Sequence, residues 1–199
     1  MGVALLLVDF QNGILKSPVI PWESDDLPKK AIAAGADILA AARKLAVPII
    51  HVGVVRALKA GALDAPRTAA AAKSGKAPRQ ILPMAAGSKD VEFVLAPEDG
   101  EEIVHKIGVS AFAGTRTETL LRNLGATDVI VAGVFTHMAT ESTVRQGFDL
   151  GFNMHVAAAA CCSPSRMLHE ASLSVGIPNF ARVLPDTASV AEAMRSLKG

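Results

Sequence analysis

Cysteine is scarce in this sequence of 199 residues, since only Cys161 and Cys162 occur and they are adjacent. Two neighbouring residues cannot cross-link distant segments, and a disulfide between them would be strained. A fold that depends on disulfides is therefore excluded. We expect both side chains to be reduced thiols that pack as small hydrophobic groups.

Long hydrophobic runs are also absent. No stretch approaches the roughly 18 consecutive apolar residues that a membrane span requires. The apolar start of the chain, MGVALLLVDFQ, lacks the basic region of a signal peptide and soon meets Asp9. We therefore predict a buried strand at this position and a cytoplasmic protein with no membrane partner.

Neither sign of charge dominates, because 20 basic and 19 acidic residues leave a formal net charge of +1. This balance gives no electrostatic reason to expect nucleic acid or a polyanionic substrate. GxGxxG and P-loop patterns are absent, so no nucleotide is implied. The histidines show no metal-ligand spacing, and His51 is predicted to be a core residue within a strand. The sequence thus indicates neither a metal nor a cofactor.

What the chain does contain is an alternation of buried strands and amphipathic helices. Half of the residues are hydrophobic, as in a globular protein, and no repeat or linker divides residues 1–199, so we predict one domain. Strand followed by helix favours right-handed crossovers and a parallel sheet, hence an α/β fold. Strands are predicted at 3–8, 47–55, 101–106, 129–132, 153–160 and 181–186, and helices at 27–45, 117–126, from 140 onward, 164–175 and 188–197.

Three polar features follow the ends of predicted strands: Asp9, Lys106 and the turn at 133–140. The carboxyl ends of parallel strands lie at one edge of a sheet, where ligands bind, so these features can converge. A turn there also directs backbone N–H groups and a helix N-terminus toward a ligand. The irregular segment 56–97 is a candidate lid or substrate loop, because long loops in compact domains are usually functional.

The segments VDFQNG, KIGVSAFAGT and GVFTHMATEST together resemble the isochorismatase-like superfamily of cysteine hydrolases, which includes nicotinamidases and ureidoacrylate amidases. The resemblance covers nearly the whole chain in order. It implies a three-layer α/β/α fold around a six-stranded parallel sheet, and hydrolysis of a small amide, ureide or carbamoyl substrate without a cofactor. It also implies a homodimer or homotetramer.

The same resemblance implies a triad of Asp, Lys and Cys, and here the chain departs from the pattern. Asp9 and Lys106 match the family aspartate and lysine, but the cysteine position is occupied by Ala139. The resemblance further implies a cis peptide at Val134–Phe135, with the N–H groups of Phe135 and Ala139 as oxyanion donors.

Three explanations for Ala139 remain open. In the first explanation, the chain is an inactivated form in which the nucleophile has been replaced, so that it can trap substrate. Alternatively, it belongs with the true isochorismatases, which resemble it in the turn, lack the cysteine and protonate a vinyl ether with the Asp. Finally, it is a homologue that binds a ligand without turning it over.

Pocket-lining residues are predicted near the strand ends. Aromatic side chains there would exclude water, and an amide would supply a hydrogen bond to the substrate. The candidates are Gln11, Trp22, Phe112, Thr136 and His137. Arginines that could bind a substrate carboxylate are Arg56, Arg67, Arg79 and Arg116.

Overall fold

The computed structural model describes residues 2–55 and 84–198, and residues 56–83 of the predicted lid, with their three candidate arginines, lie outside this part. Six parallel strands form one sheet in the order β3-β2-β1-β4-β5-β6. The predicted α/β fold with a six-stranded parallel sheet is confirmed. The strands are β1 (Gly2–Val8), β2 (Ile49–Val54), β3 (Glu102–Lys106), β4 (Ala126–Gly133), β5 (Asn153–Ala157) and β6 (Ala181–Leu184).

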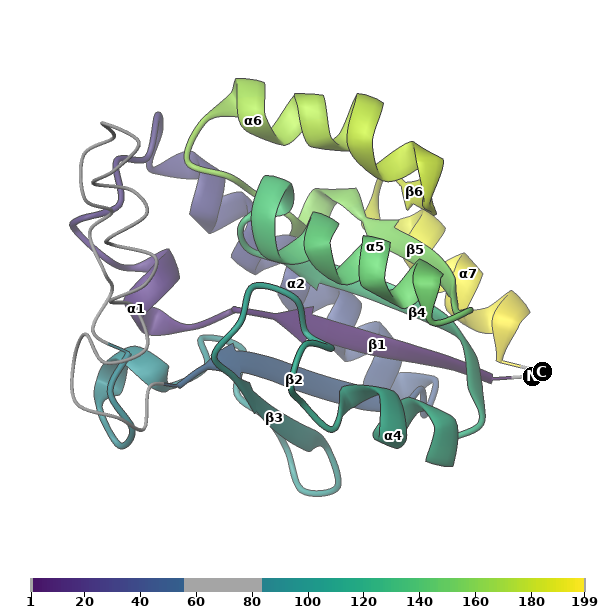
Figure 1. The fold of residues 1–199 in the computed structure, drawn as a ribbon. Coiled ribbons are helices and arrows are strands. Elements are labelled where there is room, and N and C mark those ends of the chain that lie inside the picture. The colour runs from purple at the N-terminus through teal and green to yellow at the C-terminus, as the bar shows by residue number, and fades with distance from the viewer. Residues whose placement is uncertain (1, 56–83, 199) are drawn as a thin grey trace.

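Helices cover both faces of this sheet, with α2 and α7 on one face and α4 and α5 on the other (Figure 1). The helices are α1 (Asn12–Leu15), α2 (Asp26–Lys44), α4 (Thr117–Asn123), α5 (Glu141–Asp149), α6 (Arg166–Ala171) and α7 (Thr187–Leu197). Short helical turns are η1 (Lys89–Val91), η2 (Thr136–Thr140), η3 (Ala158–Ala160), η4 (Ser172–Gly176) and η5 (Ile177–Asn179).

The position of β1 at the centre of the sheet explains why its sequence is a continuous apolar run rather than an alternating one. Leu5 and Leu7 pack with the core on the α2 and α7 side, whereas Leu6 and Val8 pack with the core on the α4 and α5 side. A strand covered on both faces needs apolar side chains at every position. Each fully buried leucine contributes about 1.5–3 kcal/mol, so β1 is a principal source of stability.

Several predicted bounds differ from the structure; for example, the helix predicted at 117–126 ends at Asn123 and Ala126 already belongs to β4. The strand predicted at 153–160 ends at Ala157, and Ala158–Ala160 form the 3₁₀ turn η3, because alanine favours helical over extended backbone. The helix predicted from 140 begins earlier, since the π-helical turn η2 opens at Thr136 and continues into α5. Single π turns inside helices are frequent at functional sites.

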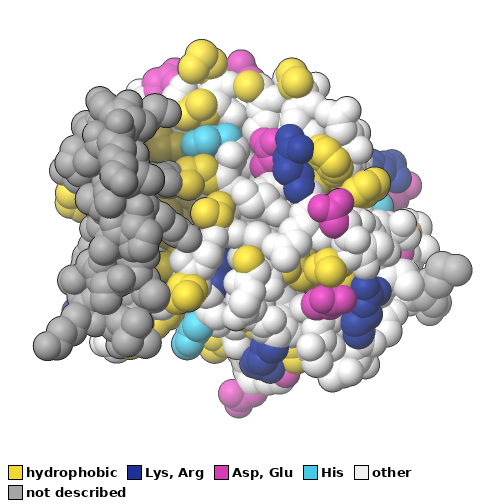
Figure 2. All heavy atoms as spheres, viewed as in Figure 1, with side chains coloured by type: hydrophobic (Ala, Val, Ile, Leu, Met, Phe, Trp, Pro, Cys, Tyr) yellow, Lys and Arg dark blue, Asp and Glu magenta, His cyan; other side chains and the backbone are white. Residues whose placement is uncertain are grey.

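Charged side chains of both signs are dispersed among hydrophobic ones on the face shown in Figure 2, so no field of one sign marks that face. Among the described residues, no helix is both long and apolar enough to cross a bilayer.

A partly buried charge network ties α2 to β2 and to Glu101, which directly precedes β3. His51 is a core residue, as predicted, and its Nε2 lies 2.8 Å from Oε2 of Glu101. Arg43 donates to the two oxygens of Glu101 at 2.7 and 3.1 Å. Burial acts to raise the pKa of Glu101, but hydrogen bonds from Arg43, the Glu98 amide and His51 outweigh it and lower the pKa to about 2.

We expect this network to stabilise the fold only while Glu101 is ionised. A carboxyl whose pKa is lowered on folding contributes fully above its unfolded pKa, here near 4.5, and the contribution is lost as pH falls toward 2. The change Glu101→Gln should lower the free energy of unfolding at pH 7 by about 1–3 kcal/mol and flatten its pH dependence between about 4.5 and 2. Urea unfolding across this pH range measures both effects.

The matched control is Glu118→Gln, because Glu118 pairs with Arg122 at the surface with both side chains more than 40% exposed. This change should alter stability by less than about 0.5 kcal/mol. Equal effects of the two substitutions would contradict the assigned role of Glu101.

Candidate active site

The structure brings Asp9 and Lys106 together at the carboxyl edge of the sheet. Asp9 follows β1, Lys106 ends β3, and both are nearly inaccessible, with 4% and 2% of their surface exposed. Lys106 Nζ donates to Asp9 Oδ2 at 2.8 Å, and also to the carbonyl oxygens of Val109 at 2.8 Å and Gly108 at 3.3 Å. An ammonium group has three N–H donors, so these contacts use its full capacity. These contacts leave Lys106 no N–H group for a ligand, so its charge is what it could contribute to one.

Asp9 is held in a backbone conformation that few residues adopt. Its φ is 61°, in the left-handed region, where Asp is tolerated better than most side chains. Such conformations cluster at active sites when the surrounding structure enforces them, and here the Asp9 amide donates to Val52 O at 2.7 Å.

Only one oxygen of the Asp9 carboxylate is used by the ion pair. Burial raises the pKa of Asp9, while the charge of Lys106 opposes this shift. Beyond a weak interaction of the carboxyl group with the Val54 backbone, which also lowers the pKa, Oδ1 is buried without a hydrogen-bond partner within residues 2–55 and 84–198. A buried carboxylate oxygen without a partner is energetically unfavourable, and it can accept a proton from a third group.

The turn after β4 lies directly beside Asp9. A Cβ at Gly133 would lie 2.8 Å from Val8 O, so only glycine lets β4 end this close to β1. Val134 N then donates to Val8 O at 3.1 Å, and the Val134–Phe135 peptide bond is cis, at the position that the resemblance implied. The chain next enters η2, which contains the buried Ala139.

The oxyanion donors that the resemblance implies, the N–H groups of Phe135 and Ala139, belong to this turn. Other N–H groups of η2 already have partners, since Thr136 N donates to Cys162 O at 2.9 Å and Met138 N donates to Phe135 O at 3.0 Å. Ala139 lies three residues into η2, and Phe135 immediately precedes it. The geometry is compatible with an anion held at this turn.

Aromatic rings from two segments meet at the turn. Trp22 packs edge-on against Phe135 with 5.7 Å between ring centroids, and Phe135 stacks on His137 at 6.0 Å. The predicted pocket residues Trp22 and His137 therefore lie beside the turn that carries Ala139.

Two pairs of side chains fix the turn to later segments. Thr136 Oγ1 lies 2.8 Å from His169 Nδ1, and His137 Nδ1 lies 2.9 Å from Ser163 Oγ. His169 and Ser163 were missed as site residues because each is more than 25 residues from its partner and no local motif marks it.

Gln11 and Phe112 differ from their predicted role. Gln11 is fully buried, and its amide bonds to backbone groups of Val54 and Val91 rather than facing a cleft. Phe112 is 5% exposed and stacks on Phe152 in the core at a centroid distance of 5.9 Å. The predicted contact of Gln11 with substrate is therefore not supported. Arg116, the described arginine candidate, pairs with Glu102 at the surface.

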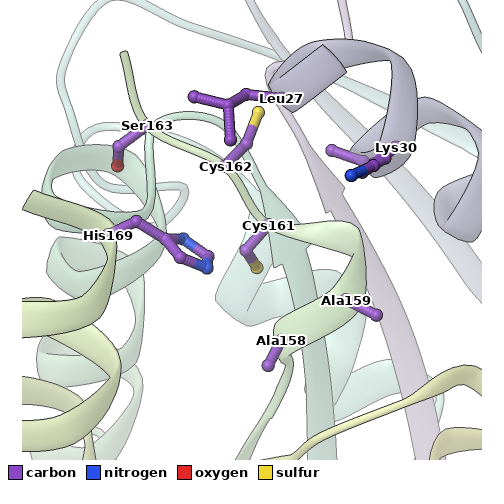
Figure 3. A pocket seen from close by; sticks show the side chains of 9 residues that line it. Leu27, Lys30, Ala158, Ala159, Cys161, Cys162, Ser163 and His169 are labelled. Carbon is purple, nitrogen blue, oxygen red and sulfur yellow. The ribbon is translucent and has the colours of Figure 1, made fainter. Parts of the chain in front are cut away.

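A cavity of about 180 Å³ lies behind the turn, on the side of α2 and α6 (Figure 3). Neither Asp9, Lys106 nor Ala139 lines it, so the cavity is separate from the ion pair. Its walls are formed by Leu27, Lys30, Ala31, Ala158, Ala159, Cys161, Cys162, Ser163 and His169.

The two thiols of this cavity do not replace the cysteine that position 139 lacks. Both are free and buried, as predicted, and they point away from each other (Figure 3). Burial raises the pKa of Cys161 to about 11 and that of Cys162 to about 12. The thiolate is the nucleophile, so both side chains are unreactive near pH 7. Within the described part of the chain, no group of three or more His, Cys, Asp or Glu side chains could hold a metal.

Comparisons with known proteins place these features in a family. The model of the isochorismatase domain matches residues 3–188. The uncharacterized isochorismatase family protein YecD of Escherichia coli O157:H7 is 30% identical over 198 residues, which cover 98% of this chain and 95% of that protein. The ureidoacrylate amidohydrolase RutB of Azorhizobium caulinodans is 31% identical over 162 residues, covering 75% and 71%.

A solved structure shows the same architecture. An isochorismatase family protein of Burkholderia thailandensis superposes with a TM-score of 0.77 at 25% identity and covers 97% of this chain and 95% of its own. Sequence and fold thus agree over nearly the full length, and the chain belongs to the isochorismatase family of hydrolases.

Proposed function

We propose that this site hydrolyses a small C–N substrate, an amide, ureide or carbamoyl compound, when a thiol occupies position 139. The observation that carries the proposal is the buried Asp9–Lys106 pair, with Asp9 Oδ1 left unpartnered among the described residues beside the turn. Asp9 would act as general base and then general acid, and Lys106 would favour the thiolate. Similarity to a ureidoacrylate amidohydrolase supports the choice of bond.

The proposed reaction has two steps. Asp9 takes the thiol proton, sulfur attacks the carbonyl carbon, and the leaving ammonia or amine departs with that proton, which leaves a thioester. Water then cleaves the thioester and restores the thiol. The tetrahedral oxyanion of each step would accept hydrogen bonds from the N–H groups of residues 135 and 139, and one such donor is typically worth about 3–4 kcal/mol of barrier.

Ala139 has no atom that can form the thioester, so the chain with alanine is proposed to be an inert form that retains its substrate. A methyl group in place of a thiol leaves Asp9, Lys106 and the backbone donors unchanged. Substrate recognition would therefore survive while turnover is lost. Trp22, Thr136 and His137 would contact the substrate from the turn side, and the assembly is proposed to be a homodimer or homotetramer.

Restoring the thiol should restore turnover. We expect Ala139→Cys to release ammonia from at least one member of a panel of small amides, ureides and carbamoyl compounds. Loss of a general base commonly costs about 10²–10⁴-fold, so adding Asp9→Asn should reduce kcat/KM by at least about 100-fold. A coupled glutamate dehydrogenase assay measures ammonia.

The control for this experiment is Ala139→Ser, which has similar size but a much weaker nucleophile. Asp9 and Lys106 are unchanged in this serine variant, which should nevertheless remain inactive. If Ala139→Cys hydrolyses no compound that the alanine form binds, the proposal is wrong.

One observation favours a second candidate function, vinyl ether hydrolysis of the isochorismatase type without a cysteine. Burial shifts the pKa of Asp9 upward, which is the direction that a general acid toward a vinyl ether requires. Vinyl ether hydrolysis of this type needs no nucleophile at residue 139, so the two candidates make opposite predictions for the activity of the unchanged chain.

We expect the unchanged chain to leave isochorismate intact. Its disappearance can be followed by chromatography between pH 5 and 8, with Asp9→Asn as the matched control. Turnover by the unchanged chain that falls at high pH and disappears in Asp9→Asn would replace our first proposal with the second. Ligand binding without turnover in both the alanine and cysteine forms would indicate a non-catalytic homologue.

A further inference from the structure

The Gln11 side chain is completely buried and makes three hydrogen bonds to the backbone. Its Oε1 accepts from Val54 N at 2.7 Å, and its Nε2 donates to Val54 O at 3.1 Å and to Val91 O at 2.9 Å. All three contacts of this amide are therefore with the end of β2 and with η1. The side chain joins segments that lie 43 and 80 residues away in the sequence.

These bonds close a ring of contacts around the ion pair. Gln11 N donates to Asp9 O at 2.8 Å, so the residue that holds Val54 also holds the backbone of Asp9. Val54 is the ladder partner of Lys106 in the pairing of β2 with β3. Lys106 in turn binds the Asp9 carboxylate. The ring runs from Asp9 through Gln11, Val54 and Lys106 back to Asp9.

Gly53 shows how closely this ring is packed. A Cβ at Gly53 would lie 2.7 Å from Gln11 Nε2 and 2.9 Å from Phe93 Cζ, whereas real Cβ atoms essentially never approach closer than 3.0 Å. The absence of a side chain at residue 53 is therefore what leaves space for the Gln11 amide. A methyl group there would displace the amide without removing any hydrogen-bonding group.

We propose that Gln11 is a positioning residue that sets the placement of Asp9 against Lys106 by fixing both to the end of β2. This inference rests on the proposed function, because the placement of Asp9 against Lys106 matters for the reaction proposed at residue 139. Gln11 itself does not touch the substrate. Its loss should change the electrostatics of the pair more than the stability of distant segments.

The first test uses the reactivity of a thiol at position 139 and needs no substrate. In Ala139→Cys protein, the rate of iodoacetamide addition to residue 139 is measured by mass spectrometry from pH 5 to 10. The rate follows the thiolate fraction, and Lys106 should keep its midpoint below the usual value of about 8.5. Adding Gln11→Met should raise the midpoint by about one pH unit, which is about a tenfold loss of rate at pH 7.

Two further variants separate positioning from general destabilisation. Gly53→Ala keeps the Gln11 amide and should raise the midpoint in the same direction, so it decides the outcome if Gln11→Met does not fold. Asn12→Ala is the matched control, because Asn12 Nδ2 donates to Lys89 O at 3.1 Å and so holds η1 without contacting β2. It should leave the midpoint unchanged.

A second measurement keeps the inference distinct from the proposed function. A carbon-13 NMR titration of the Asp9 carboxyl in the unchanged chain should show a shifted midpoint in Gln11→Met and Gly53→Ala but not in Asn12→Ala. An ordinary thiol pKa in Ala139→Cys would overturn the proposed function alone. Unchanged Asp9 titration in both Gln11→Met and Gly53→Ala, or an equal shift in Asn12→Ala, would overturn the role of Gln11.

Discussion

The ion pair between Lys106 and Asp9 is the interaction on which this site depends. Two charges are removed from water at the sheet edge, and such burial is tolerated only when the partners satisfy each other. Lys106 is satisfied by Asp9 and two carbonyl oxygens, whereas Asp9 keeps one oxygen without a partner among the described residues. The asymmetry is informative, because a purely structural pair gains nothing from an unbonded carboxylate oxygen.

The fold supplies the rest of the arrangement through backbone contacts. β1 lies between β2 and β4, so Asp9 emerges where both neighbours end, and Gly133 brings the η2 turn against Val8. The side chain at residue 139 contributes only a methyl group to the proposed site, in which Asp9 would be the base, Lys106 the cation and the amides of residues 135 and 139 the oxyanion donors. A buried ion pair with an unpaired oxygen is energetically unfavourable, so its presence beside an inert methyl group is consistent with a protein whose nucleophile has been replaced. It is also consistent with a reaction in which Asp9 acts without a nucleophile at residue 139.

Much of this architecture could be predicted from the sequence, because it follows from local patterns and parallel topology. The unbroken apolar run of β1 predicts burial on both faces, and residues that follow parallel strands share an edge, which is why Asp9 and Lys106 could be expected to converge. The role of Gln11 could not be predicted, since its partners Val54 and Val91 are distant in sequence. Residue type alone predicts a pocket position for Phe112, but side-chain direction in a loop is set by packing, here against Phe152.

The most direct test of the central claim is a crystal structure of the Ala139→Cys protein. Our account predicts that the sulfur introduced at position 139 lies within roughly 3–4 Å of Asp9 Oδ1, as a hydrogen bond to sulfur requires, while Lys106 Nζ remains bound to Oδ2. A sulfur atom well outside this range, with Asp9 Oδ1 bonded to another protein group, would contradict it.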